Sequence, residues 1–127
     1  MATTELTAEN FESVVDGGGL VLVDFWAAWC GPCRMFGPVF ERVSERHPDV
    51  VFGKVDTEAE PVLAGGFGIS SIPTLMIIRD KVVLYEQAGA LPEHALEQLI
   101  SHARDIDMDD VRARLAENAE GVDPARA

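Results

Sequence analysis

Both cysteines of the chain lie in one short segment, Cys30-Gly31-Pro32-Cys33. An apolar run over residues 21–27 precedes this segment, and apolar residues at helical spacing follow it over 36–43. Two cysteines separated by two residues at a junction between strand and helix bring one thiol to the helix N-terminus, where partial positive charge favours the thiolate. This placement predicts a redox site whose disulfide can open and close.

Length and composition indicate a single domain that needs no disulfide to fold. The chain has 127 residues, 47% of them hydrophobic, which is enough for a buried core. Its formal net charge of -12 argues against nucleic acid or an anionic membrane as a partner. Residues 1–5 lack the features of a secretion signal, and no apolar stretch reaches membrane-spanning length. We therefore expect a cytoplasmic protein, in which a cysteine pair is catalytic or metal-binding rather than structural.

Helical and strand patterns alternate along the chain. The run over 20–27 is apolar nearly throughout, as in a strand buried on both faces, so it should lie in the centre of a sheet. Asp80-Lys81 should form the turn of a hairpin, although this pair replaces the usual Asn-Gly type. The alternation predicts an α/β fold with a central mixed sheet and helices on both faces. Four helices are expected: from Thr7 as N-cap to 17–19, from the cysteines to 47–48, over 57–63, and over 96–103 after Pro92. The second of these helices should be kinked at Pro38. Further strands are expected over 50–55, 74–78 and 82–86.

The composition becomes acidic near the C-terminus, so we divide the chain into a domain over 1–104 and an extension over 105–127. Apolar residues between Met108 and Leu115 recur at helical spacing, and Asp107 is placed to cap such a helix. The extension is either a short helix with a frayed end, which could dock or offer a partner a surface, or a solvated segment throughout. The sequence contains no internal repeat and no second domain.

The segment from Asp24 to Cys33 is followed by Pro38, Lys54-Val55-Asp56, Phe67-Gly68-Ile69, Ile72-Pro73-Thr74 and Gly89-Ala90. In order and spacing these segments resemble the thioredoxin family. The resemblance covers roughly residues 5–103 and implies the thioredoxin fold and a protein-disulfide reductase without a bound cofactor. It also implies a monomer that is recharged by thioredoxin reductase and that serves clients such as ribonucleotide reductase, peroxiredoxins and methionine sulfoxide reductase.

The order of reaction follows from the positions of the two cysteines. Cys30 precedes the helix, where unpaired backbone N–H groups stabilise a thiolate, so it is the expected nucleophile. Cys33 lies one turn further along and is expected to be more buried, which suits it to resolve rather than to attack first. Cys30 would attack a client disulfide, and Cys33 would then attack the mixed disulfide and release the reduced client. Gly31 and Pro32 between the cysteines resemble the reductants of the family rather than its oxidants and isomerases.

Asp24 interrupts the apolar strand, where a charged carboxylate is costly unless its pKa shifts or it finds a partner. A raised pKa would suit a proton acceptor for Cys33. The resemblance implies this role for Asp24 and places Lys54 close enough on the neighbouring strand to tune it. From the residues alone, Asp24 could instead be a structural acid that makes hydrogen bonds, and Lys54 an ordinary solvent-facing lysine.

Pro73 lies between Ile72 and Thr74 at the entry to a strand, an awkward place for a proline outside a tight turn. The resemblance implies a cis peptide bond before Pro73, packed against the cysteines, so that the backbone around Ile72 can pair with an extended client strand. The alternative is a trans proline in a turn. The implied client surface is flat and apolar, and Trp26 is as consistent with core packing as with the site. The members of this surface are Trp29, Ile72, Pro73, Gly89 and Ala90.

Three other functions remain open from the sequence. An oxidase or isomerase is opposed by Gly31-Pro32 and by the missing secretion signal. A metal site would combine both cysteines with two of the three histidines, but their spacing matches no recognisable zinc pattern. A non-redox interaction module would bind through the apolar rim around Trp29, with incidental thiols. The histidines are His47, His94 and His102.

Overall fold

The computed structural model describes the backbone of residues 2–121 and the side chains of residues 2–117. The strands are β1 (Thr3–Glu5), β2 (Leu20–Trp26), β3 (Val51–Asp56), β4 (Thr74–Arg79) and β5 (Val82–Ala88). They form one sheet in the order β1-β3-β2-β4-β5. β2 lies in the middle, as its apolar run predicts, and is parallel to β3 but antiparallel to β4. The prediction of a central mixed sheet is confirmed.

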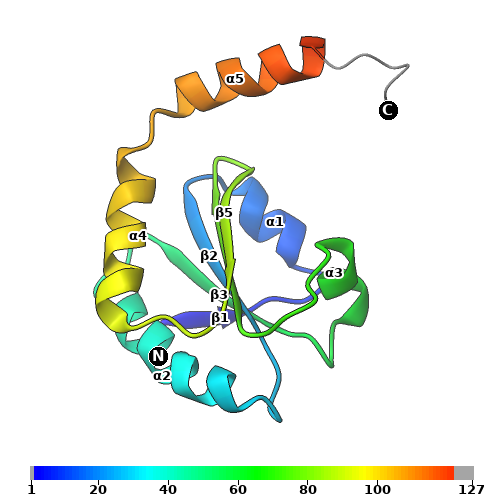
Figure 1. The fold of residues 1–127 in the computed structure, drawn as a ribbon, viewed down its shortest axis with the longest axis vertical. Helices are drawn as coiled ribbons and strands as arrows, with labels where there is room; N and C mark the ends of the chain where they lie inside the picture. Colours follow the sequence, from blue (N-terminus) through cyan, green and yellow to red (C-terminus); the bar gives the residue numbers. More distant parts are fainter. Residues whose placement is uncertain (1, 122–127) are drawn as a thin grey trace.

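Helices cover both faces of this sheet, as predicted. The helices are α1 (Phe11–Asp16), α2 (Gly31–Glu45), α3 (Pro61–Gly66), α4 (Glu93–Asp105) and α5 (Met108–Gly121). α2 and α4 lie on one side of the sheet, and α1 and α3 lie on the other (Figure 1). Pro38 lies inside α2, and the kink expected there stays a prediction.

The pleat of β2 decides which of its side chains face α2. Leu22 belongs to the core that includes residues of α2 and α4, whereas Val23 and Phe25 belong to the core on the opposite face. Successive side chains of a strand point to opposite faces, so Asp24 lies on the α2 side, next in line after Leu22. The strand therefore places one carboxylate beneath the helix that begins at the cysteines.

The N-terminus departs from the predicted helix. Residues Thr3–Glu5 form β1, and α1 begins at Phe11 with Asn10 rather than Thr7 as its N-cap. The Asn10 side chain accepts a hydrogen bond from the Thr7 backbone N–H at 2.7 Å, which closes a turn before the helix. The predicted end of this helix is confirmed, because Gly17 is its C-cap. A three-residue edge strand is too short for its alternation to stand out in the sequence.

The helix predicted over 57–63 begins later and ends later than expected, because α3 spans Pro61–Gly66. Asp56 Oδ1 accepts hydrogen bonds from the backbone N–H groups of Glu58 and Ala59, at 2.9 and 3.3 Å. These bonds hold the residues after β3 in a turn. The polar side chain therefore delays the helix until Pro61, a residue well suited to the first helical turn.

The turn between β4 and β5 has the usual hairpin geometry despite its unusual sequence. Asp80 and Lys81 have φ angles of 51° and 71°, and a type I′ turn requires positive φ at both central residues. Asp80 also exchanges two hydrogen bonds with Gly19: its N–H donates to the Gly19 carbonyl, and its Oδ1 accepts from the Gly19 N–H. These bonds to a distant loop help to hold a conformation that Lys81 disfavours.

The C-terminal extension contains the predicted helix, α5, capped by Asp107. The Asp107 Oδ1 accepts from the N–H groups of Asp109 and Asp110, and the Met108 side chain is buried. α5 lies beyond the end of the sheet (Figure 1). The predicted frayed end lies in 122–127, outside the described residues, and the division at residue 104 stays a prediction. No helix within residues 2–121 is long and apolar enough to cross a membrane.

Candidate active site

The two cysteines form a disulfide at the start of α2. Cys30 is the N-cap residue, and its Sγ accepts a hydrogen bond from the backbone N–H of Cys33 at 3.2 Å. Pro32 lies in the first turn, where its missing N–H removes no helical hydrogen bond. The local sequence thus places the Cys30 sulfur at the positive end of the helix, as predicted.

The two cysteine residues differ in their surroundings rather than in their exposure. Both cysteines are 4% exposed, so the expectation that Cys33 is more buried than Cys30 is wrong. The loop before β4 covers Cys30, whose Sγ lies 3.7 Å from the carbonyl oxygen of Ile72. Cys33 instead lines a hollow of about 310 Å³ together with Trp26 and Lys54. The loop before β4 thus helps to bury Cys30 as much as Cys33 is buried, and the two cysteines face different neighbours.

The loop before β4 lies against the disulfide. Its Ile72–Pro73 peptide bond is cis, and Ile72 packs on a small cluster that contains both cysteines. The Pro73 carbonyl accepts a hydrogen bond from the Gly89 N–H at 2.8 Å, which ties the end of β5 to this loop. The structure therefore brings together Ile72, Pro73 and Gly89, three of the residues assigned to the client surface.

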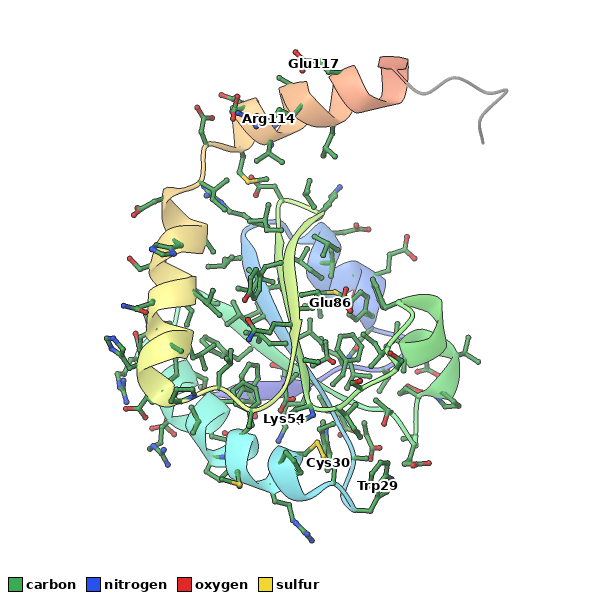
Figure 2. The ribbon with its side chains drawn as sticks, in the orientation of Figure 1. Trp29, Cys30, Lys54, Glu86, Arg114 and Glu117 are labelled. Atoms are coloured by element: carbon green, nitrogen blue, oxygen red, sulfur yellow. A yellow bond between two sulfur atoms is a disulfide. The ribbon has the colours of Figure 1, made fainter. Side chains whose placement is uncertain are left out.

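Trp29 directly precedes Cys30 and is exposed beside it (Figure 2). Its side chain is 66% exposed, and its Nε1 donates a hydrogen bond to Glu58 Oε1 at 2.6 Å. Figure 2 shows Trp29, Cys30 and Lys54 at one end of the molecule, opposite Arg114 and Glu117 of α5. Gly31, Pro32 and Ala90 are exposed as well. The sequence carries no signal for Glu58, because its partner comes from a distant segment.

Asp24 lies fully buried in β2, as its place in an apolar strand indicated. Both of its carboxylate oxygens are without a hydrogen-bond partner among the described residues. Burial raises the pKa of Asp24 to about 7, and the positive charge of Lys54 opposes this rise. The alternative of a structural acid with its own hydrogen bonds does not describe this carboxylate.

Lys54 is the register partner of Asp24 on the neighbouring parallel strand. It is partly buried, and its Nζ lies 5.0 Å from the centre of the Trp26 ring, a cation–π distance. Trp26 in turn packs against the cluster of the two cysteines, so it serves both the core and the site. Lys54 therefore turns toward the site, unlike an ordinary solvent-facing lysine.

The hollow beside Cys33 also contains Glu41, a residue that sequence reasoning missed. Glu41 follows Cys33 by two helical turns and lines the hollow together with Gly37. Its Oε1 accepts a hydrogen bond from Thr3 Oγ1 at 2.6 Å, whereas its Oε2 is buried without a partner among the described residues. The spacing Cys33, Gly37, Glu41 is the signal that could have placed it on the face of α2 that carries the thiol.

A metal site does not assemble around the cysteines in the described part of the chain. Among residues 2–117, whose side chains the structure describes, there is no cluster of three or more His, Cys, Asp or Glu that could hold an ion. His47 instead lies between Glu97 and Arg104, at 2.9 and 3.0 Å from its two ring nitrogens. Both ring nitrogens of His47 are thus already in contact with side chains of α4.

Comparisons with known proteins agree with this geometry. The family model for thioredoxin matches residues 2–102. A Streptomyces coelicolor protein whose name assigns it to the thioredoxins is 60% identical over 116 residues, 91% of this chain and 87% of that protein. This match is long enough to extend into α5.

Two solved structures show the same fold. A mutant thioredoxin from Halobacterium salinarum has a TM-score of 0.76 at 31% identity, over 83% of this chain and 93% of its own. A second structure comes from work on the thiol resolving mechanism of a yeast mitochondrial 1-Cys peroxiredoxin through glutathione and thioredoxin systems. It has a TM-score of 0.73 at 29% identity, over 80% of this chain and 95% of its own. Together with the Cys30–Cys33 disulfide at the N-terminus of α2, these matches show that the chain belongs to the thioredoxin family and is a protein-disulfide oxidoreductase.

Proposed function

We propose that the protein reduces disulfides in client proteins. In the dithiol state, the Cys30 thiolate attacks one client sulfur, the client S–S bond breaks, and the other client sulfur leaves as a thiolate that takes up a proton. The Cys33 thiol then gives its proton to Asp24 and attacks the Cys30 sulfur, which releases the second client thiolate. This second thiolate takes up a proton from water, and Asp24 returns its proton to the solvent. The client has then gained two electrons and two protons, and the protein is left as the Cys30–Cys33 disulfide.

The observation that carries this proposal is the disulfide at the N-cap of α2, together with a buried, unpaired carboxylate at Asp24. The register partner of Asp24, Lys54, lines the same hollow as Cys33. Cys30 receives the Cys33 N–H and lies beside the loop that a client would meet, which suits the first nucleophile. Cys33 lies inside the helix and lines the hollow with Lys54, which suits the resolving thiol. The two cysteines are thus distinguished by what they face.

Asp24 is the proposed proton acceptor for Cys33. A carboxylate with a pKa of about 7 exchanges protons readily at neutral pH, whereas an ordinary aspartate would hold none there. The proposed role of Lys54 is to favour the ionised form of Asp24, because the ammonium of its register partner is the positive charge that acts on this carboxylate. The pair would then set how strongly Asp24 holds the proton.

The proposed client surface consists of Trp29, Ile72, Pro73, Gly89 and Ala90. An extended client strand would pair with the backbone around Ile72, while Pro73 offers no N–H of its own to compete. The exposed Trp29 ring would contact the client beside Cys30. The hydrogen bond from the Gly89 N–H to the Pro73 carbonyl and the Ile72 carbonyl beside the Cys30 sulfur support this placement, because they bring these segments together at the site.

The direction of electron flow is proposed from the residues between the cysteines, because Gly31-Pro32 resembles the reductants of the family. From membership of the family we propose thioredoxin reductase as the electron donor and a monomeric protein. From the features of residues 1–5 we propose that the protein is cytoplasmic. The peroxiredoxin named with the yeast structure supports a client of that class. Ribonucleotide reductase and methionine sulfoxide reductase are the other proposed clients. A disulfide oxidase or isomerase is the rival function.

Equilibration against defined thiol and disulfide buffers would test the direction by giving the reduction potential of the Cys30–Cys33 couple. A potential at the negative end of the biological range supports a reductant, and one near the oxidant end supports the rival. Cys33→Ser should trap a client as a mixed disulfide on Cys30, whereas the matched variant Cys30→Ser should trap none. Equal trapping by both variants would contradict the order of attack, and no reversible couple would contradict the proposed redox function.

A further inference from the structure

One face of α2 carries a line of three residues, Cys33, Gly37 and Glu41. They are four positions apart, so they lie above one another on the helix. All three line the hollow of about 310 Å³ that Lys54 and Trp26 also line. Because Gly37 has no side chain, no group from the middle of this line reaches into the hollow. A Cβ atom at Gly37 would lie 3.8 Å from Lys54 Nζ, which places the ammonium beside this gap.

Glu41 brings a carboxylate to the hollow in a fixed position. The Thr3 hydroxyl of β1 donates to its Oε1 at 2.6 Å, a short hydrogen bond between the sheet edge and the helix. Its Oε2 is buried and has no hydrogen-bond partner among the described residues. A buried carboxylate oxygen without a partner is costly, and a nearby positive charge is the natural compensation.

Lys54 is the cation placed to supply this compensation. It forms no ion pair within the part of the chain that the structure describes. Its register partners are Asp24 on β2 and Glu5 on β1, and α2 adds Glu41 and Arg34 to the groups around the hollow. Asp56 lines a second hollow with Lys54, but its Oδ1 already accepts two backbone N–H groups. Glu5 is exposed, so water screens its charge, whereas Asp24 and the Glu41 Oε2 are buried.

We propose that Glu41 is a positioning residue of the dithiol site and competes with Asp24 for the ammonium of Lys54. When Asp24 is protonated, Lys54 turns to Glu41, and when Asp24 ionises, Lys54 is drawn toward it. The negative charge of Glu41 therefore opposes the ionisation of Asp24. This inference rests on the proposed role of Asp24 and adds a third charge to it.

An NMR titration of the Asp24 carboxyl carbon in the oxidised protein tests the inference without a client. Glu41→Gln removes the charge but keeps a carbonyl acceptor for Thr3. We expect it to lower the pKa of Asp24 by about 0.5 to 1, because Lys54 is freed and a neighbouring negative charge is lost. The matched control is Glu45→Gln, an exposed glutamate one turn further along α2, which should leave the titration unchanged.

Two more variants separate charge from structure. In a Lys54→Met background, the effect of Glu41→Gln should shrink by at least half, because the shared cation is gone. Thr3→Val breaks the tether and keeps the charge, so it should shift the Asp24 titration less than Glu41→Gln does. An unchanged Asp24 pKa in Glu41→Gln, an equal shift in Glu45→Gln or Thr3→Val, or a full shift without Lys54 would each overturn the inference.

This test is independent of the proposed function. Urea unfolding of each variant confirms that the titrated protein is folded. The Asp24 titration uses only the oxidised protein, whereas the proposed reaction is measured on the dithiol with a client. If the Glu41 prediction fails, Glu41 has no part in the ionisation of Asp24. The proposed role of Asp24 would still be tested separately, by the reaction of the dithiol with a client.

Discussion

Two aspartates near opposite ends of α2 have opposite environments. Asp24, near the N-terminal end, is fully buried with both oxygens unpaired, and burial raises its pKa to about 7 against the charge of Lys54. Asp49, beyond the C-terminal end, is exposed, and the hydrogen bond from Arg104 lowers its pKa to about 2. The same side chain is thus held ready to bind a proton at one end and kept ionised at the other.

The residues around each aspartate follow the same contrast. At the C-terminal end of α2, arginine side chains are joined to α4 by ion pairs at 3.0 Å, and His47 adds a hydrogen-bond contact to α4 at 2.9 Å. Near the cysteines, Asp24 and one oxygen of Glu41 are buried without partners, and Lys54 rests on Trp26. Unpaired buried groups cost stability, and their presence at this end is consistent with the proton transfer that we propose for Asp24. The paired residues are Arg42, Arg46 and His47 on one side and Glu93 and Glu97 on the other.

Replacing Asp24 should have the largest effect on stability. The folded protein holds this proton more tightly than the unfolded chain, whose aspartate has its ordinary pKa of 3.8. The stabilisation is therefore fully present below about pH 4 and is lost as pH rises to about 7. Asp24→Asn removes this dependence of stability on pH. As the pH rises from 5 to 8, the free energy of unfolding of the variant should therefore increase by about 2.5 kcal/mol relative to that of the wild type.

Urea denaturation of the oxidised protein at several pH values measures this effect. Asp49→Asn is the matched control, because its pKa shift has the opposite sign and the group is exposed. That variant should not gain stability with rising pH. Parallel pH profiles for wild type and Asp24→Asn would show that Asp24 is not held protonated by burial, and the contrast between the two aspartates would fail.

Filling the hollow at Gly37 should also raise the stability of the protein, but by less. A Cβ there would make an ordinary contact with Lys54 Nζ at 3.8 Å, and alanine favours a helix over glycine by about 1 kcal/mol. Gly37→Ala should therefore stabilise the protein by up to about 1 kcal/mol in thermal or urea unfolding.

Gly53→Ala supplies the contrasting case for that experiment. A Cβ at Gly53 would come within 2.2 Å of Leu6 Cδ1, so this substitution overpacks the core and should destabilise the protein by about 1 to 3 kcal/mol. Destabilisation by Gly37→Ala as well would mean that the hollow has no room for a methyl group.

Breaking a pair at the other end of α2 should have the smallest effect on stability. Arg104→Met removes the donor that holds Asp49 ionised, so the pKa of Asp49 should rise from about 2 toward its ordinary 3.8. Because the pair is exposed, the loss of stability should be slight and should vanish in high salt. Carboxyl NMR and unfolding at two salt concentrations measure both quantities. Arg114 pairs with Asp110 on α5, so the control variant Arg114→Met should leave the pKa of Asp49 unchanged.

The sequence alone predicts the elements that depend on local pattern. The apolar run over 20–27 identifies the central strand, and its single acidic interruption identifies Asp24 as a buried carboxylate. Features that depend on distant segments are not visible in this way. Thr3 holds Glu41, and Glu58 holds Trp29, across 38 and 29 residues of sequence. The similar exposure of the two cysteines likewise comes from the loop at Ile72, which no pattern around Cys30 reveals.

The most direct test of the central claim is the rate at which Cys33 resolves a mixed disulfide on Cys30, measured in single turnover across pH. If Asp24 accepts the Cys33 proton, the wild-type rate should rise with pH and level off above about pH 7, where Asp24 is ionised. Asp24→Asn should release the client about 100-fold more slowly at neutral pH. Release at the wild-type rate with the wild-type pH profile would contradict the claim that the buried carboxylate serves the resolving thiol.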